Sequence, residues 1–196
     1  MDFPSIKISD DPLIMVFKIP DVIWEEIKSW VKESKRIKNN PLSELKAHQN
    51  TGYLHFGTSE KNNSYQCSVS PHLIEQSFWL AWVLRLTAKH WGPDEDNYHR
   101  RFKLRKWDGH FDGYDLWTNF SYKGDKNPVH THVGYLSGVI YCQNHKHPTL
   151  FPDQSVGYNG ENKTMILFPS SVPHFVEEQT VNKERITIAF NISLNQ

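Results

Sequence analysis

The stretch NPVHTH at residues 127–132 decides how this sequence is interpreted. Its two histidines, His130 and His132, project from one face of an extended segment, because side chains alternate along a strand. His174 follows 42 residues after His132, just after the apolar run MILFP at 165–169, and Arg185 lies 11 residues further on. This layout indicates a mononuclear metal held between strands, with a cation nearby for an anionic ligand.

The sequence around this stretch consists mainly of short strand-like runs. From residue 99 onward they fall at 101–107, 115–122, 133–143, 164–168, 174–177 and 184–194. Turn signals such as Gly124-Asp125 and Asn159-Gly160 separate them. Such a succession predicts a β-sandwich or jelly roll.

The first half of the chain has helical periodicity instead. After a strand at 13–19, apolar residues recur with a period typical of a helix at 22–38, and a short strand is predicted at 53–56. A second helix begins after Ser70 and stops at Gly92. We therefore expect one mainly β domain over residues 1–196, with a helical N-terminal part at 1–98 and a jelly-roll core at 99–196.

Composition narrows the possible partners and compartments. The 22 basic residues balance the 22 acidic ones, so no net charge draws the chain to nucleic acid or to an anionic membrane. The basic stretch at 100–107 is interpreted as an edge strand with a charged outer face, with a nucleic-acid strip as the alternative. The sequence has no signal-peptide pattern and no long apolar run, and its two cysteines lack CxxC spacing. We expect a soluble, cytoplasmic protein.

Three further motifs accompany the histidine pair: LSGVIY at 136–141, FPSSVPH at 168–174 and RITIAFN at 185–191. In combination they resemble the 2-oxoglutarate/Fe(II)-dependent oxygenases, a prolyl-hydroxylase-like family, over roughly residues 117–192. The resemblance implies a double-stranded β-helix, that is, a jelly roll with helices packed on one sheet. It also implies Fe(II) as the metal, with 2-oxoglutarate as cosubstrate and O₂ as oxidant.

The same resemblance implies the metal ligands. His130 takes the place of the first ligand and His174 that of the distal one, whereas His132 stands where related enzymes have a carboxylate. Three interpretations remain open: His132 is a ligand in an all-histidine site, its position is vacant, or a carboxylate such as Asp153 replaces it. We favour the first, because the strand period aims His132 at the ion.

Arg185 is the second strong element, because a guanidinium suits bidentate capture of a carboxylate. The resemblance implies that Arg185 holds the far carboxylate of 2-oxoglutarate. Thr187 lies on the same side of the predicted strand and adds a hydroxyl donor. Tyr141 and Tyr122 resemble tyrosines that line the cosubstrate pocket in related enzymes; the alternative is that either is a core aromatic.

Other polar residues are less decisive. Trp117 and Asn119 match the strand before the turn and could face the pocket or the core. The second histidine pair, His145 and His147, is interpreted as lying in a solvated or substrate-facing loop, and residues 143–163 are where we expect substrate contacts.

The predicted function is an Fe(II)- and 2-oxoglutarate-dependent dioxygenase that hydroxylates an unactivated C–H bond of a peptide side chain or a small molecule. Succinate and CO₂ are the expected coproducts. Two alternatives belong to other classes: a three-histidine metal dioxygenase that needs no keto acid, and a non-catalytic jelly-roll binding module.

Overall fold

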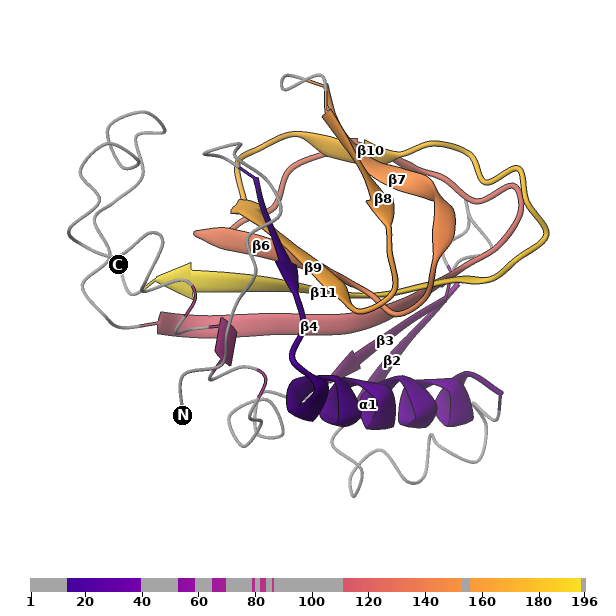
Figure 1. The fold of residues 1–196 in the computed structure, drawn as a ribbon, viewed down its shortest axis with the longest axis horizontal. Helices are drawn as coiled ribbons and strands as arrows, with labels where there is room; N and C mark the ends of the chain where they lie inside the picture. The colour runs from indigo at the N-terminus through magenta and orange to yellow at the C-terminus, as the bar shows by residue number, and fades with distance from the viewer. Residues whose placement is uncertain are drawn as a thin grey trace.

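The computed structural model describes residues 14–39, 53–58, 65–69, 79, 82, 83, 86, 111–152 and 156–194. Within them one long helix accompanies two antiparallel sheets that face each other (Figure 1). The elements are β1 (Met15–Lys18), α1 (Asp21–Asn39), β2 (Tyr53–Thr58), β3 (Tyr65–Val69), β4 (Phe111–Ser121), β5 (Asn127–His130), β6 (Leu136–Tyr141), β7 (His145–Phe151), β8 (Val156–Gly160), β9 (Thr164–Pro169), β10 (His174–Val176) and β11 (Arg185–Leu194). This arrangement confirms the predicted mainly β, jelly-roll fold.

The larger sheet has seven strands in the order β1-β9-β6-β11-β4-β3-β2. Two of its central strands are buried on both faces: every residue of β9 is buried, and β6 has one half-buried position. Burial on both faces requires cover on both sides. The smaller sheet lies over one face and α1 over the other, so the core fills the space on either side of β6, β9 and β11 (Figure 1).

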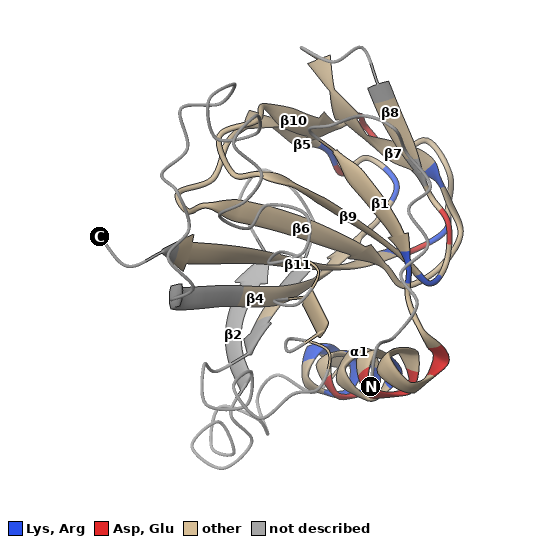
Figure 2. Ribbon diagram, turned by 60° about the vertical axis from the view of Figure 1, so that its left-hand side comes forward, with Lys and Arg blue, Asp and Glu red and all other residues tan. Residues whose placement is uncertain are grey.

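Helix α1 covers the outer face of the larger sheet as its amphipathic sequence predicts. Its buried residues recur at helical spacing and are Ile23, Ile27, Trp30, Ser34 and Ile37. The hydroxyls of Ser34 and Thr118 are 2.9 Å apart at the interface with β4. Figure 2 shows charged residues along α1, whereas β6 and β9 carry none. The predicted bounds, 22–38, differ from the observed ones by a single residue at each end.

The second predicted helix is described at four positions only, all of them helical and buried: Trp79, Trp82, Val83 and Leu86. Their spacing of three and four residues is that of one helix face. Trp79 packs edge-on against Trp30, with ring centroids 5.7 Å apart, and against Phe190 at 5.5 Å. These contacts place it on the same side of the larger sheet as α1.

The smaller sheet has four strands in the order β5-β10-β7-β8 and corrects one expectation. Residues 143–163, predicted to be a loop, contain the hairpin of β7 and β8. The sequence HKHPTLF of β7 looks polar, yet its residues alternate between buried and less buried positions as in a strand covered on one face. The sequence does not predict this strand, because polar residues such as His145 and His147 lie on its buried face.

Three further points concern the first half of the chain and the membrane. Strand β3 pairs with β2 and β4 and was not predicted. The predicted strand at 101–107, together with its alternative as a nucleic-acid strip, lies outside the described residues. None of the helical segments that the structure describes is both long and apolar enough to span a bilayer.

Candidate metal centre

The two histidines of the NPVHTH stretch are held differently from each other. His130 is the last residue of β5, whereas His132 lies beyond the end of that strand. His132 thus lies just outside the strand, yet its ring belongs to the same cluster as that of His130, as the sequence predicts. The backbone N–H of His132 donates to the carbonyl of Ser170 at 2.9 Å, and this bond directs the chain back across the cavity between the sheets.

The turn after His132 depends on a glycine. Gly134 has φ of +139°, a value that side-chain-bearing residues rarely adopt. A Cβ at this position would also lie 3.1 Å from the carbonyl oxygen of Ile192. The close approach of this turn to β11 fixes the direction from which His132 enters the cavity.

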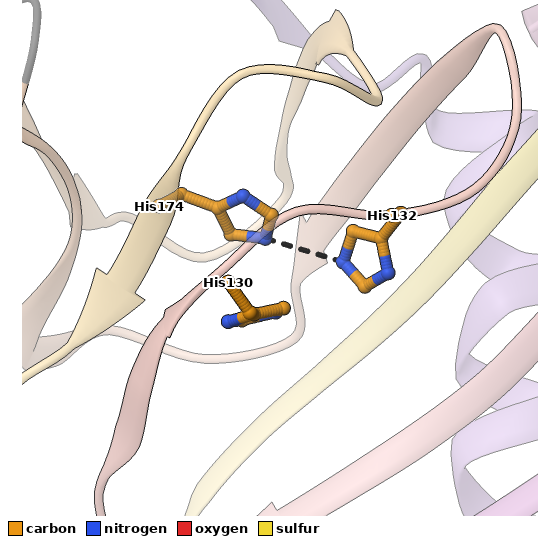
Figure 3. Close-up of side chains that lie close together, drawn as sticks. All are labelled: His130, His132 and His174. Atoms are coloured by element: carbon orange, nitrogen blue, oxygen red, sulfur yellow. Dashed lines mark hydrogen bonds between the residues drawn. The ribbon is translucent and has the colours of Figure 1, made fainter.

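His174 completes the cluster from the neighbouring strand. It begins β10, where its Cα partner on β5 is His130. The ring centroid of His174 lies 4.3 Å from that of His130 and 5.0 Å from that of His132. One nitrogen from each of the three rings lies within 4.8 Å of the others, and the rings converge on one point (Figure 3).

Hydrogen bonds to main-chain carbonyls set the tautomers of two rings. His130 donates from Nδ1 to the carbonyl of Pro128 at 2.7 Å, and His174 donates from Nδ1 to that of Val172 at 3.0 Å. Because Nδ1 of each ring is engaged in this way, Nε2 is the nitrogen that remains available as a metal ligand. Burial, reinforced by the other two histidines, lowers the pKa of His174 to about 4, so that its ring is neutral near pH 7.

The spacing of one histidine pair, His132 and His174, fits a transition metal. The Nε2 atoms of His132 and His174 are 3.2 Å apart. Two imidazole nitrogens that bind one ion at about 2.1 Å, with an angle between about 90° and 109°, lie about 3.0–3.4 Å apart. Neutral imidazoles suit Fe, Zn, Cu and Ni. Among the described residues the cluster contains no carboxylate, and Asp153 lies outside them.

Arg185 opens the second half of the site. It lines the same cavity of about 270 Å³ as the three histidines. Its side chain is 6% exposed, yet no described carboxylate pairs with it. Its Nη2 donates to the hydroxyl of Thr149 at 3.4 Å, and its Nε has no partner among the described groups. Burial lowers the pKa of the guanidinium, as expected for a cation removed from water.

The remaining predicted cosubstrate residues lie at different distances from this cation. Thr187 is buried and lines the cavity. Tyr141 is buried but does not line it; its hydroxyl donates to Thr149 at 2.7 Å, and its ring centroid lies 5.8 Å from Cζ of Arg185. Tyr141 therefore contacts Arg185 directly through its ring and is connected to it through its hydroxyl by way of Thr149. No sequence motif selects Thr149.

The position of Tyr122 differs from the expectation that it lines the cosubstrate pocket. Its hydroxyl donates to Glu184 at 2.8 Å and contacts Nζ of Lys38, so it connects the end of α1 to the start of β11. It is not among the residues that line the cavity. The expected contact between Tyr122 and a cosubstrate is therefore not supported by its position. Sequence spacing could not reveal on which face of the sheet it emerges.

The second histidine pair is also a correction. His145 and His147 are buried, not solvated. His145 donates from Nε2 to the carbonyl of Lys183 at 3.2 Å, and Nε2 of His147 accepts from the backbone N–H of Thr180 at 3.0 Å. Both rings thus fix the loop that leads into β11, and neither lines the cavity. Burial lowers the pKa of His145.

The structure resolves where two ambiguous residues point. Trp117 and Asn119 both line the cavity. The ring centroid of Trp117 lies 6.0 Å from that of His132. Asn119 pairs with Thr187 across β4 and β11, so the two side chains are neighbours on the face that carries Arg185.

No family model matches the sequence, and no curated protein matches it either. Solved structures do match. A candidate oxygenase from Shewanella oneidensis superposes with a TM-score of 0.63 at 12% identity, over 93% of this chain and 82% of that one. Dioxygenase for auxin oxidation 1 from Arabidopsis thaliana, in complex with 2-oxoglutarate, gives 0.59 at 12% identity, over 92% and 84%. The collagen prolyl hydroxylase of Paramecium bursaria Chlorella virus-1, also with 2-oxoglutarate, gives 0.53 at 11% identity, over 94% and 98%. By structure, this chain has the fold of 2-oxoglutarate-dependent dioxygenases and prolyl hydroxylases.

Proposed function

We propose that this protein is a non-haem Fe(II)- and 2-oxoglutarate-dependent dioxygenase that hydroxylates an unactivated C–H bond. The observation that carries the proposal is Arg185, a buried cation without a described carboxylate partner that faces the same cavity as three converging histidines. A buried unpaired charge is unfavourable unless a ligand neutralises it. The complementary ligand is an anion that reaches from the histidine cluster to Arg185.

A keto acid with two carboxylates satisfies both ends of the cavity. His130, His132 and His174 would hold the metal through nitrogen, which leaves coordination positions for the keto-acid end. Arg185 would pair with the far carboxylate, and Thr187 would donate its hydroxyl to the same group. Thr149 stays bonded to Tyr141 and steadies the guanidinium.

The chemistry that Fe(II) supplies in such a site consumes 2-oxoglutarate, O₂ and a C–H bond, and yields succinate, CO₂ and an alcohol. The protein holds the ligand rings in fixed tautomers through the carbonyls of Pro128 and Val172. Apolar side chains such as Phe168 and Val139 keep much of the cavity wall dry. Trp117 and Asn119, beside the histidines and Thr187, are placed to orient a substrate.

The structural neighbours support the choice of cosubstrate, because two of those described above were solved with 2-oxoglutarate. We propose a peptide side chain or a small molecule as substrate, and nucleic acid is not expected from the balanced charge. Cys67 and Cys142 are not joined in a disulfide, which fits a reducing compartment, and we propose the cytoplasm.

An anaerobic titration of 2-oxoglutarate into the Fe(II)-loaded protein tests the proposal. A saturable metal-to-keto-acid charge-transfer band is expected. Arg185→Ala should weaken 2-oxoglutarate binding by about 10- to 100-fold, in line with the loss of a charged hydrogen-bonding partner. Arg36→Ala, which removes an exposed arginine of α1, is the matched control and should change nothing. Bound iron without a band would refute the use of a keto acid.

One observation favours a second candidate, a three-histidine dioxygenase that does not use a keto acid. The cluster contains only neutral ligands among the described residues, unlike a site with two histidines and a carboxylate. In that case Arg185→Ala should leave O₂ consumption largely intact. The third possibility, a binding module with structural histidines, requires that no variant or metal elicits O₂ consumption.

A further inference from the structure

A chain of buried polar side chains reaches the wall of the same cavity, at Ser137, and has no part in the chemistry proposed above. It runs through Ser170, Ser137 and Asn191, whose exposed fractions are 0%, 1% and 6%. The Ser137 hydroxyl donates to Oδ1 of Asn191 at 2.7 Å. The Ser170 and Ser137 hydroxyl oxygens are 2.9 Å apart, and since the Ser137 proton is already engaged, Ser170 is the donor.

The main chain of Ser170 connects this chain to His132. The carbonyl of Ser170 accepts the backbone N–H of His132 at 2.9 Å, and the N–H of Ser170 donates to the carbonyl of Tyr135 at 3.1 Å. Both ends of the turn that carries His132 are thereby attached to one residue. His132 lies beyond the end of β5, so this turn, and not a strand, carries it toward the cluster.

We propose that Ser170, Ser137 and Asn191 are positioning residues for His132, the ligand that replaces a carboxylate in this centre. The proposal rests on the metal site of the proposed function but not on the keto acid. The chain starts on β11, crosses β6 and ends at the turn after β9, so it ties His132 to three strands of the larger sheet. Buried polar groups are unfavourable unless they are paired, and here each one is used to hold the next.

The test measures metal binding alone, by titrating Co(II) into the metal-free protein and following the visible absorbance of the bound ion. Ser137→Ala removes one oxygen and breaks the chain at its centre. We expect it to weaken Co(II) binding by about 10- to 100-fold, the range found for groups that orient metal ligands. Ser34→Ala is the matched control, because it removes an equally buried serine hydroxyl that bonds to another hydroxyl on the opposite face of the same sheet.

The control variant should lose thermal stability to a similar extent as Ser137→Ala yet bind Co(II) as the wild type does. A double-mutant cycle then separates positioning from general loosening: in the His132→Ala background, Ser137→Ala should weaken binding by less than about threefold. Should Ser137→Ala fail to fold, Ser170→Ala breaks the same chain from its other end.

Two results would overturn the proposal. The first is unchanged Co(II) binding by a folded Ser137→Ala or Ser170→Ala protein; the second is an equal loss with and without His132. Failure of the proposed function looks different, because a protein that binds Co(II) with the expected dependence on Ser137 but gives no charge-transfer band with 2-oxoglutarate keeps this inference and loses the keto acid.

Discussion

The two sheets divide the work of the site unequally. The smaller sheet supplies His130 from β5 and His174 from β10, whereas the larger sheet supplies Arg185 and Thr187 from β11. Their burial differs as well: β9 of the larger sheet is buried throughout, while β5 is exposed except at His130. The metal ligands on strands therefore come from the smaller sheet, whose strand β5 is exposed, and the anion-binding residues come from the larger, more buried sheet.

This difference indicates what each half needs. A metal centre needs a few groups converging from a short distance, and short hydrogen bonds to carbonyls are enough to aim them. A buried cation attracts an anionic ligand more strongly where water is excluded, and a sheet covered on both faces excludes water. The comparison leads to four predictions, from the largest expected effect to the smallest.

Removing a metal ligand should abolish metal binding by the histidine cluster. His174→Ala is expected to weaken Co(II) binding by more than about 100-fold, because the loss of a ligand exceeds the loss of a group that merely orients one. His147→Ala, which removes another buried histidine from the same sheet, should leave the affinity unchanged. Calorimetric titration of both variants checks this, and comparable losses in the two would mean that the histidines are structural.

Replacing the buried cation should affect stability and ligand binding in opposite directions. Arg185→Met keeps the length of the side chain and removes a buried charge that no described carboxylate pairs with, so the free energy of unfolding without ligand should rise by about 1–3 kcal/mol. The wild type loaded with Fe(II) should gain about 2.7 kcal/mol from 2-oxoglutarate at 100 times its dissociation constant, and the variant should gain almost none at that concentration. Anaerobic urea unfolding measures both. A variant less stable than the wild type without ligand would show that Arg185 serves the fold.

One substitution made in each sheet compares their packing directly. At Gly138 of β6 a Cβ would lie 2.1 Å from the ring of Phe190, and at Gly157 of β8 it would lie 2.5 Å from the end of Leu150. The ring is buried between the sheet and its helices, whereas Leu150 is half-buried and can turn away. Gly138→Ala should cost about 2 kcal/mol and Gly157→Ala less than about 0.5 kcal/mol. If urea unfolding shows equal losses of stability in the two variants, the larger sheet is not more tightly packed at this position than the smaller one.

Acid should lower the stability of the protein through a histidine of the smaller sheet, His145. Burial lowers the pKa of His145 below its ordinary value of 6.5, so the folded protein binds fewer protons than the unfolded chain. Stability from this group is complete above pH 6.5 and is lost as pH falls toward the lowered pKa. His174 adds to the same slope, so the comparison is between the wild type and His145→Gln. The variant should show a flatter dependence of the urea midpoint between pH 7 and 5, and an identical slope would contradict the assignment.

The sequence predicted the larger sheet better than the smaller one, for a physical reason. Strands β6 and β9 are mostly apolar, and such segments have few alternatives to burial. Strand β7 contains Pro148 and two histidines whose polar atoms are satisfied by the loop before β11, a contact that no local pattern reveals. The sequence therefore predicts a loop where the structure has the hairpin of β7 and β8.

The candidate site shows the same limit. Motif spacing was sufficient to select the three histidines and Arg185, which the structure brings to one cavity. It could not show that Arg185 lacks a described carboxylate partner, because pairing depends on residues distant in sequence. It could not assign Tyr122 to the α1 side of the sheet, nor select Thr149 and Ser170, whose roles come from single hydrogen bonds across strands.

The start of β11 joins two environments through one peptide bond. Glu184 contacts Lys38 and Tyr122 beside α1, and the next residue, Arg185, enters the cavity. A ligand that restrains Arg185 also restrains the main chain of Glu184, and with it the last turn of α1. Amide hydrogen exchange in that turn should therefore slow when the cavity is filled, although the helix itself touches no ligand. The outer surface of the molecule would then report on an event that takes place between its sheets.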